Sequence, residues 1–412
     1  MARSDTDPRT LFSQLPSDRW IDLVFERLHA ESPAAVRERE AHSFDAVAAP
    51  FSDALLLFGA GWLGRFVLNG LRKAGVEPIA FIDNNPEIWG TTVEGLPVLS
   101  PVDALARHGA TSCVVVTVYH GSTVTAQLRS AGFPRIAPVI HLFWKYATQF
   151  IPSSCTDLPH RLVEQEGAIR AGFAVLADDA SRREFCEQLL WRFHPAGSIL
   201  SAHQPGADTY FPDDVVVPLA EEVFVDCGAF DGDSARAFLA RRGGAFGRMF
   251  LLEPDADNRA ALRGWMATLP TEAAARITAL PYGVSDQDAT FSFRATHNAG
   301  STLLSTDGDV SIDCRRLDTL FAQESPTFIK MDIEGAEPMA ITGGAGTLRT
   351  RRPVLAICVY HRSEHLWEIP RLIHRIQPDY RLFVRRYAED CWELVCYAVP
   401  VERLVERFAS PR

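Results

Sequence analysis

One stretch of the sequence combines glycines with acids directly after an apolar run, a pattern that can bind a positively charged ligand. The stretch reads "VFVDCGAFDGDS" and contains Gly228 and Gly232, with Asp226 and Asp231 beside them. Glycine lets the backbone approach a ligand without interference from a Cβ atom. A phosphate-binding loop uses exposed N–H groups and gains nothing from acids. The acids therefore predict a ligand with an ammonium or a sulfonium group, and we expect these four residues to bind it.

Two later apolar runs also end in acids that can contact the same ligand. Glu253 ends the run in "LLEPDADN", about twenty residues beyond the glycine turn, where a carboxylate can accept hydrogen bonds from both hydroxyls of a ribose. Asp286, in "PYGVSDQD", follows the next run, where it can contact an adenine ring. S-adenosylmethionine has a sulfonium, an ammonium, a ribose and an adenine but no phosphate. The three strand ends together predict S-adenosylmethionine as the cofactor.

The run "FIKMDIEGAE" has polar groups where an acceptor molecule would meet the cofactor. Asp332 is the first polar residue after the strand and the first candidate for orienting an acceptor hydroxyl or taking its proton. Glu334 is a second catalytic candidate, with hydrogen bonding to nearby backbone as the alternative. Glu337 can instead cap the helix that follows, because negative charge stabilises a helix N-terminus. Lys330 lies two residues before Asp332 and is expected to pair with an acid.

His361 follows the apolar run "LAICVY" and is the third catalytic candidate. Histidine titrates near neutral pH, which suits a general base for an alcohol. A structural histidine with hydrogen-bonded ring nitrogens is the alternative. The spacing of Asp332, Glu337 and His361 matches no dedicated metal motif, so no metal is predicted.

An earlier glycine loop, "FGAGWLG", differs from the later one because it contains no acid. Gly59, Gly61 and Gly64 follow an apolar run. Asp83 ends the next run, about twenty residues further on. This is the dinucleotide fingerprint, in which the acid binds a ribose hydroxyl. NAD or a sugar nucleotide is therefore one expectation for this region, and a scaffold or dimerisation role without a ligand is the other.

The order of the apolar runs predicts the fold class. Runs alternate with glycine turns and helical segments twice along the chain, which predicts an α/β protein with two Rossmann-like doubly wound domains. The last two runs, "YRLFVRRY" and "CWELVCYAV", lie too close together for a crossover helix and should pair antiparallel. The predicted parts are a helical extension (1–50), a nucleotide-binding domain (51–150), a helical connector (151–215) and a cofactor-binding domain (216–412).

Composition narrows the class of partners. The 412 residues include 52 acidic and 41 basic side chains, and the formal net charge of -11 disfavours a surface that binds nucleic acid. No apolar run is long enough to span a membrane, and the polar start "MARSDTDPRT" lacks the apolar core of a signal peptide, so a cytoplasmic location is expected. The eight cysteines form no CxxC pair, which predicts a reducing compartment without structural disulfides.

The segments "VFVDCGAFDGDS", "LLEPDADN", "GVSDQDATFSF" and above all "FIKMDIEGAE" resemble the FkbM family of S-adenosylmethionine-dependent methyltransferases. With "AICVYHRSEHLWEIP" and "YRLFVRRY" downstream, the resemblance covers Phe211 to Val401. It implies S-adenosylmethionine as cofactor, the Rossmann-like class I methyltransferase fold for residues 216–412, and O-methylation of a hydroxyl on a sugar or natural product. This sequence departs from the family at Phe230, where many members have asparagine. The region around Gly59 resembles nucleotide-binding domains of enzymes in sugar and glycan synthesis.

A methyltransferase acting on a small-molecule acceptor, with sugars, glycan precursors and natural products as the expected class, is the function that the sequence favours. The alternatives are an NAD-dependent nucleotide-sugar oxidoreductase or epimerase-like enzyme and a non-catalytic nucleotide-binding sensor. Loops build acceptor pockets in such folds, here residues 196–215 and the segment "FRATHNAGSTLLSTDGD", where His297 and Asn298 either contact the acceptor or face solvent. The oligomeric state stays open between a monomer and a homo-oligomer.

Overall fold

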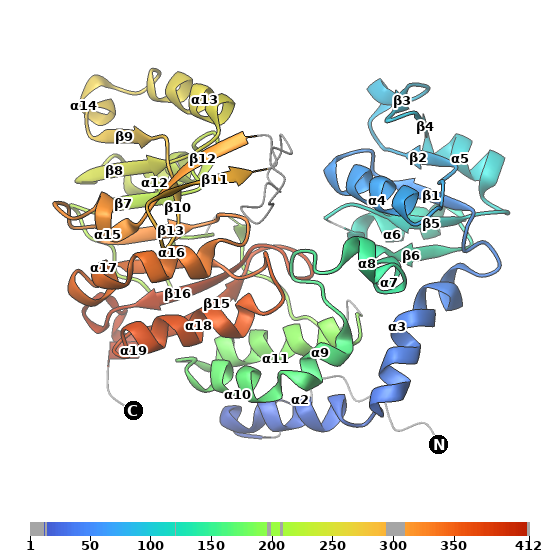
Figure 1. Cartoon of the computed structure of the whole chain (residues 1–412), viewed down its shortest axis with the longest axis horizontal. Helices are drawn as coiled ribbons and strands as arrows, with labels where there is room; N and C mark the ends of the chain where they lie inside the picture. The colour runs from blue at the N-terminus through green and yellow to red at the C-terminus, as the bar shows by residue number, and fades with distance from the viewer. Residues whose placement is uncertain are drawn as a thin grey trace. The chain divides into compact units, whose positions relative to one another are not determined.

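The chain divides into two compact units that are not contiguous in sequence. The computed structural model describes Phe12 and residues 15–119, 121–195, 199–206, 209–293 and 310–409. The segment with His297 and Asn298 lies outside these residues. Figure 1 shows the course of the chain from its N-terminus to its C-terminus. The two units are unit 1 (Met1–Glu166, Cys186–Ser201 and Glu389–Trp392) and unit 2 (Gly167–Phe185, Ala202–Ala388 and Glu393–Arg412).

Unit 1 contains a mainly parallel sheet with helices between its strands. The strands are β1 (Leu55–Phe58), β2 (Ala80–Ile82), β3 (Thr92–Val93), β4 (Leu96–Leu99), β5 (Cys113–Val116) and β6 (Ile136–Pro138). The helices are η1 (Ser17–Arg19), α2 (Trp20–Leu28), α3 (Pro33–Ala48), α4 (Trp62–Lys73), η2 (Pro86–Ile88), α5 (Pro101–His108), α6 (Gly121–Ala131), α7 (Val139–Lys145), α8 (Ala147–Phe150) and α9 (Pro159–Glu164). The strand order is β3-β4-β2-β1-β5-β6, and β3 pairs antiparallel with β4. The predicted strand, glycine turn, helix and second strand are β1, α4 and β2, and the two strands pair in parallel.

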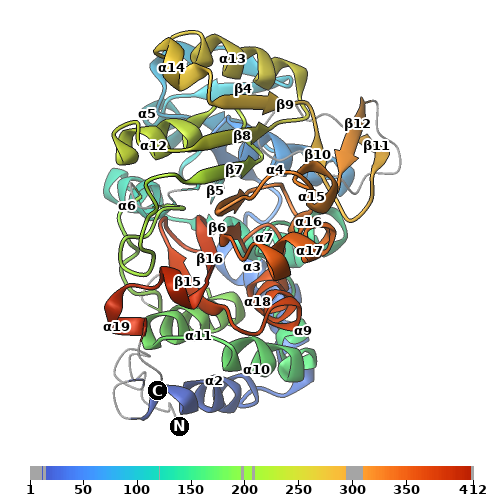
Figure 2. The same cartoon turned by 90° about the vertical axis from the view of Figure 1, so that its left-hand side faces the viewer.

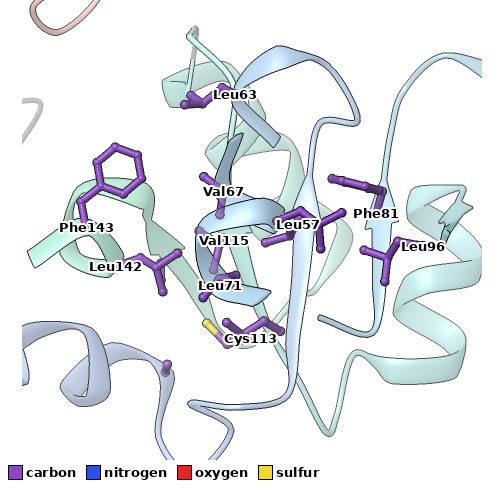
Figure 3. Packing of buried hydrophobic residues seen from close by; sticks show 14 of the residues in the cluster. Leu57, Leu63, Val67, Leu71, Phe81, Leu96, Cys113, Val115, Leu142 and Phe143 are labelled. Carbon is purple, nitrogen blue, oxygen red and sulfur yellow. The ribbon is translucent and has the colours of Figure 1, made fainter. Parts of the chain in front are cut away.

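Successive residues of the strands in unit 1 face two separate hydrophobic cores. Leu57 of β1 packs in one cluster of buried residues, and its neighbour Leu56 packs in the other. Figure 3 shows the first cluster, which also contains Phe81 of β2 and Leu71 of α4. Side chains on alternate sides of a strand point to opposite faces, so a sheet that is covered on both faces needs a continuous apolar run. This explains why β1 reads "LLLF" without a polar residue.

The N-terminal extension is helical, as the apolar spacing predicts. Trp20, Val24 and Leu28 are all buried on α2. The next helix, α3, begins with a favourable cap, because the Ser32 hydroxyl accepts a hydrogen bond from the Ala35 N–H at 3.2 Å. Such caps satisfy N–H groups that have no partner within the first turn of a helix.

Unit 2 is built around a seven-stranded sheet and a smaller three-stranded one. The strands are β7 (Val223–Cys227), β8 (Arg248–Leu252), β9 (Ile277–Leu280), β10 (Gly283–Val284), β11 (Ala289–Phe293), β12 (Val310–Arg315), β13 (Phe328–Met331), β14 (Val354–Cys358), β15 (Arg381–Arg386) and β16 (Leu394–Val399). The helices are α12 (Asp233–Arg242), α13 (Ala256–Met266), α14 (Thr271–Ala274), α15 (Leu317–Leu320), α16 (Glu337–Gly343), α17 (Ala345–Thr350), α18 (His365–Ile376), η4 (Val401–Arg403) and α19 (Glu406–Ala409). Two further helices, α10 (Glu166–Ala174) and α11 (Asp179–Phe193), contribute residues to both units.

The large sheet has the order β15-β16-β14-β13-β7-β8-β9. Its central strands β13, β7 and β8 are parallel, so their carboxyl ends meet at one edge. The last strand, β16, pairs antiparallel with both β14 and β15, which confirms the predicted antiparallel pair. In the small sheet, which Figure 2 shows from another side, β12 lies between β10 and β11. The α/β fold class, with helices between parallel strands, is confirmed.

The central strands of unit 2 are held to α12 by aromatic packing. Phe224 of β7 stacks on Phe238 of α12, with ring centroids 4.7 Å apart. Phe328 of β13 and Phe211 also contact Phe224, at 5.8 and 5.6 Å. Aromatic pairs of this kind each contribute about 0.5–1.5 kcal/mol beyond the burial of their surface. The packing fixes the two strands that carry the polar residues described below.

The expectation that the chain has no disulfide is wrong for one pair of cysteines. Cys155 and Cys391 form a disulfide across 236 positions of sequence. The other six cysteines form no disulfide and are buried, where a thiol behaves as a small apolar side chain. The spacing of the cysteines did not reveal this disulfide, because the two residues are brought together only by the fold. No helix in the described part of the chain is long and apolar enough to cross a membrane.

Thiol counting checks this pairing. Protein purified without reductant and unfolded in guanidinium should show six reactive thiols, rising to eight after reduction. A Cys155→Ser, Cys391→Ser double variant should show six thiols under both conditions. Eight thiols in the unreduced wild-type protein would contradict the disulfide.

Candidate active site

Two charged side chains link the central strands of unit 2. β13 pairs with β7 in a register that sets Lys330 opposite Asp226. The Lys330 Nζ atom lies 3.0 Å from the Asp226 Oδ1 atom, and both side chains are buried. Nζ also donates a hydrogen bond of 2.7 Å to the carbonyl oxygen of Gly228. Lys330 therefore pairs with an acid, as expected, and it also holds the first turn of the glycine loop.

Burial and the attraction between the two charges shift the pKa of each residue of this pair in opposite directions. Burial raises the pKa of Asp226 to about 6, although the ammonium of Lys330 pulls it down. Burial alone would lower the pKa of Lys330, but the charges of Asp226 and Asp332 overcome it and raise that pKa. Both side chains are therefore ionised at neutral pH, and each depends on the other for its charge to be tolerated in the interior.

The glycines of the loop are required by its close contacts. Gly228 has a φ of 80°, and an added Cβ would lie 2.0 Å from the backbone oxygen of Asp332. Gly232 has a φ of 93°, and its Cβ would lie 2.9 Å from the side chains of Leu262 and Trp265. Side chains are disfavoured at such angles and have no room here. The loop after β7 thus lies directly against the end of β13.

Glu253, at the end of β8, anchors the same loop from its other side. Its Oε2 atom accepts the backbone N–H of Phe230 at 2.9 Å, and Oε1 accepts that of Asp255 at 2.9 Å. The residue is 6% exposed, and burial raises the pKa of its carboxyl group. Oε1 also accepts a long hydrogen bond of 3.5 Å from the Asn258 side-chain amide. A carboxylate has about four acceptor positions, so Oε2 can still accept one more hydrogen bond.

Two other predicted cofactor residues have partners within the protein. Asp231 Oδ1 lies 2.7 Å from the guanidinium of Arg236, and both side chains are exposed. Asp286 Oδ1 accepts a hydrogen bond of 3.2 Å from the hydroxyl of Ser285. Their roles toward a cofactor stay predictions. Asp231 in particular has its charge offset by a neighbouring cation.

Asp332, directly after β13, accepts hydrogen bonds from three side chains of unit 2. Its Oδ2 atom lies 2.9 Å from the hydroxyl of Tyr210, and Oδ1 lies 3.1 Å from Nε2 of His361 and 3.4 Å from the hydroxyl of Tyr360. Burial would raise the pKa of Asp332, but His361 and Lys330 hold it well below its usual range. Asp332 is therefore a charged carboxylate whose orientation is fixed.

His361, after β14, lies between acids at both of its ring nitrogens. Nδ1 is 2.7 Å from Glu337 Oε1, and Nε2 faces Asp332 as well as Glu334 Oε2 at 3.7 Å. Burial alone would lower the pKa of His361, but Glu337 and Asp332 raise it well above its usual value. The ring is therefore a buried imidazolium at neutral pH. His365, 3.4 Å from Glu337, differs because burial lowers its pKa to about 4.

Glu334 is the most exposed of the acids in this cluster. Its backbone has a φ of 56°, a region that costs free energy for a residue with a side chain. The side chain is 32% exposed. Burial, together with the charges of Asp332 and Glu337, raises the pKa of Glu334 to about 8, against the pull of His361. The structure thus brings the three predicted catalytic residues, Asp332, Glu334 and His361, into one cluster.

The glycine loop of unit 1 is anchored in the same way as that of unit 2. Asp83 Oδ2 accepts the N–H of Ala60 at 2.9 Å, and Oδ1 accepts that of Asn85 at 2.9 Å. Asp83 therefore corresponds to Glu253, as an acid at the end of a second strand that holds the preceding loop.

The three glycines of that loop have different roles. Gly59 has a φ of 107°, and a Cβ on Gly64 would lie 1.9 Å from the Gly59 carbonyl oxygen. A Cβ on Gly61 would have no atom within 4 Å. Gly59 and Gly64 are thus explained by packing within unit 1. The local geometry leaves the reason for Gly61 open.

Sequence reasoning missed two tyrosines and the full role of Glu337. Tyr210 lies in a segment that was expected to be a connector, and no local pattern links it to Asp332. Tyr360 directly precedes His361, so its position next to a candidate residue was the available signal. Glu337 lies in the first turn of α16, where the capping alternative put its charge, but its side chain accepts the Ile333 N–H ahead of that helix at 3.0 Å and also binds His361. Within the described residues, no group of His, Cys, Asp or Glu side chains could hold a metal ion.

The buried ion pair gives a stability prediction. Lys330→Met leaves Asp226 buried without a partner and should lower the free energy of unfolding by about 3–5 kcal/mol in urea denaturation at pH 7. Protonation of Asp226 removes its buried charge and so avoids this cost. Because the pKa of Asp226 is higher in the folded than in the unfolded protein, the loss of stability should shrink as the pH falls towards about 4. The Asp226→Leu, Lys330→Met double variant should recover most of the stability. A cost below about 1 kcal/mol for the single variant would contradict the role of the pair.

Comparisons with known proteins place this site within a family. Residues 226–389 match the model of the methyltransferase FkbM domain. The 2-O-methyltransferase NoeI of Sinorhizobium fredii (strain NBRC 101917 / NGR234) is 29% identical over 163 residues, which cover 33% of this chain and 64% of that enzyme. The match thus spans less than two thirds of the relative's length. The similarity to methyltransferases does not support the oxidoreductase alternative. It also does not support NAD or a sugar nucleotide as a ligand.

A solved structure supports the same assignment of fold. The crystal structure of methyltransferase FkbM from Methylobacillus flagellatus KT aligns with a TM-score of 0.69 at 23% identity. The alignment covers 93% of this chain and 100% of that one. The C-terminal region of this chain therefore contains an FkbM methyltransferase domain.

Proposed function

We propose that this chain transfers the methyl group of S-adenosylmethionine to a hydroxyl of a small molecule, with sugars and glycan precursors as the favoured acceptors. The observation that carries this proposal is the meeting of three strand ends at one edge of the large sheet. There the Gly228 loop lies against Asp332, and Glu253 holds the same loop. We further propose that residues 216–412 act as the methyltransferase domain and that residues 51–150 form a separate α/β domain.

The residues at this edge fit the cofactor. Glu253 is buried yet has an acceptor position left on Oε2 for a ribose hydroxyl, and a second hydroxyl can replace the long hydrogen bond from Asn258 on Oε1. Gly228 lets the loop backbone lie close to the ligand and to Asp332 at the same time. When bound, S-adenosylmethionine supplies a methyl group on a positively charged sulfur, and the protein's task is to align an acceptor oxygen with it and to exclude water.

The cluster around Asp332 suits an alcohol acceptor. Asp332 keeps its charge and is fixed by Tyr210 and His361, so it can orient a hydroxyl by accepting a hydrogen bond. Its low pKa makes it a weak base, and His361 is already protonated. Glu334, with a pKa of about 8 and partial exposure, is better matched to taking the proton of the hydroxyl.

An oxygen acceptor is also supported by a relative. NoeI, which is 29% identical over 163 residues, is named as a 2-O-methyltransferase. The clustered carboxylates can accept hydrogen bonds from several neighbouring hydroxyls. This agrees with an acceptor that, like a sugar, has more than one hydroxyl.

Calorimetric titration with S-adenosylhomocysteine tests the cofactor site. Glu253→Ala should weaken binding about 10- to 100-fold, because a buried, charged hydrogen-bond acceptor is lost. Asp83→Ala is the matched control, since it removes the equivalent loop anchor in unit 1 and should change the affinity by less than about twofold. Equal weakening in both variants, or none in Glu253→Ala, would contradict the assignment of Glu253.

An assay of methyl transfer to a panel of sugar glycosides, with the release of S-adenosylhomocysteine as the measured signal, tests the acceptor side. With an acceptor that gives turnover, Asp332→Asn should lower kcat by about 10²- to 10⁴-fold while binding of S-adenosylhomocysteine is retained. The exposed Asp379→Asn serves as its control. The kcat of the wild-type protein should rise with pH and level off above about 8, because Glu334 accepts a proton only when ionised. Glu334→Gln should abolish this rise, and an unchanged profile in that variant would exclude Glu334 as the proton acceptor.

A further inference from the structure

The glycine loop of unit 2 contains a phenylalanine whose conformation and exposure are both unfavourable. Phe230 has a φ of 47°, in the left-handed region that glycine and asparagine adopt more readily. Its side chain is also among the exposed large hydrophobic groups, at 45% exposure. Neither the backbone angle nor packing within the protein explains an aromatic residue at this position. Strained residues of this kind concentrate where a ligand binds.

The position of Phe230 is fixed between two parts of the candidate site. Its N–H donates to Oε2 of Glu253, the proposed ribose acceptor, at 2.9 Å. Two residues earlier in the loop, Gly228 lies against the backbone of Asp332, the proposed acceptor-binding residue. In S-adenosylmethionine the sulfur is joined to the ribose through one carbon and bears the methyl group that must face the acceptor. If Glu253 binds the ribose and Asp332 binds the acceptor, the sulfur lies between them, beside the part of the loop that contains Phe230.

Two of the three acids of the loop have their charges offset by neighbouring cations. Asp226 is paired with Lys330, and Asp231 is paired with Arg236. Their charges are thus offset before any ligand binds. The face of an aromatic ring attracts a cation through its quadrupole, and this attraction strengthens when the site excludes water. The Phe230 ring can supply it, whereas the Asp233 carboxylate accepts hydrogen bonds from the N–H and hydroxyl of Ser234 at the start of α12.

We propose that the Phe230 ring forms the wall of the cofactor site at the sulfonium end and favours the charged S-adenosylmethionine over the neutral S-adenosylhomocysteine. This inference rests on the proposed function, and it adds a residue that distinguishes substrate from product. Because the product has lost the positive charge, it loses the attraction to the ring. Phe230 thereby weakens the binding of the product relative to that of the substrate.

The test compares the affinities of S-adenosylmethionine, S-adenosylhomocysteine and sinefungin, which has an ammonium in place of the sulfonium. Phe230→Leu retains an apolar side chain but removes the aromatic face. It should weaken binding of both charged ligands about three- to tenfold and leave that of S-adenosylhomocysteine within about twofold. Phe230→Asn should show the same selective loss and also raise the melting temperature, because asparagine tolerates the left-handed backbone. Melting curves of the Leu variant check that it is folded.

The outcomes separate this inference from the function it rests on. Equal weakening of all three ligands in Phe230→Leu would mean that the ring supplies only apolar contact, and unchanged affinities would mean that it does not reach the cofactor. Either result overturns the role of Phe230 while the methyltransferase assignment stands. A wild-type protein that binds none of the three ligands would overturn the proposed function itself.

Discussion

The buried pair of Asp226 and Lys330 is the interaction on which the arrangement of the site depends. It joins the two central strands of the large sheet through their side chains, and the same ammonium group holds the carbonyl oxygen of Gly228. The start of the glycine loop and the strand that ends in Asp332 are thereby fixed to each other. Two charges in the interior are tolerated only when each has its partner, so the loop and the strand form one unit. This contact therefore links the proposed cofactor site to the proposed acceptor site.

A second network sets the charges on the acceptor side. Glu337 is fully buried and binds His361, which therefore stays protonated and in turn keeps Asp332 ionised. Glu334 lies at the exposed end of this network and has the raised pKa that a proton acceptor near neutral pH requires. Two neighbouring carboxylates thus have opposite shifts, a pattern that enzymes use to separate an orienting group from a base.

The sequence predicted more of the fold than of the contacts within the site. Apolar runs and glycine turns mark the strands, and because carboxyl ends of parallel strands share an edge, Gly228, Glu253 and Asp332 could be placed together. The hydrogen-bond and ion-pair partners of the acids were harder to predict from the sequence. Tyr210 reaches Asp332 across 122 positions, and the Cys155–Cys391 pair spans 236, so no local pattern encodes either contact. Asp231 is a different case, because its partner Arg236 is only five positions away and offsets the charge that favoured a cationic ligand.

A crystal structure of the protein with S-adenosylhomocysteine tests the central claim most directly, namely that the edge formed by β7, β8 and β13 is the cofactor site. The account predicts that the ribose hydroxyls lie within hydrogen-bond distance of Glu253 and that the sulfur lies between the Phe230 ring and Asp332. A ligand found at the Gly59 loop, or one at the β7 edge whose ribose faces away from Glu253, would contradict it.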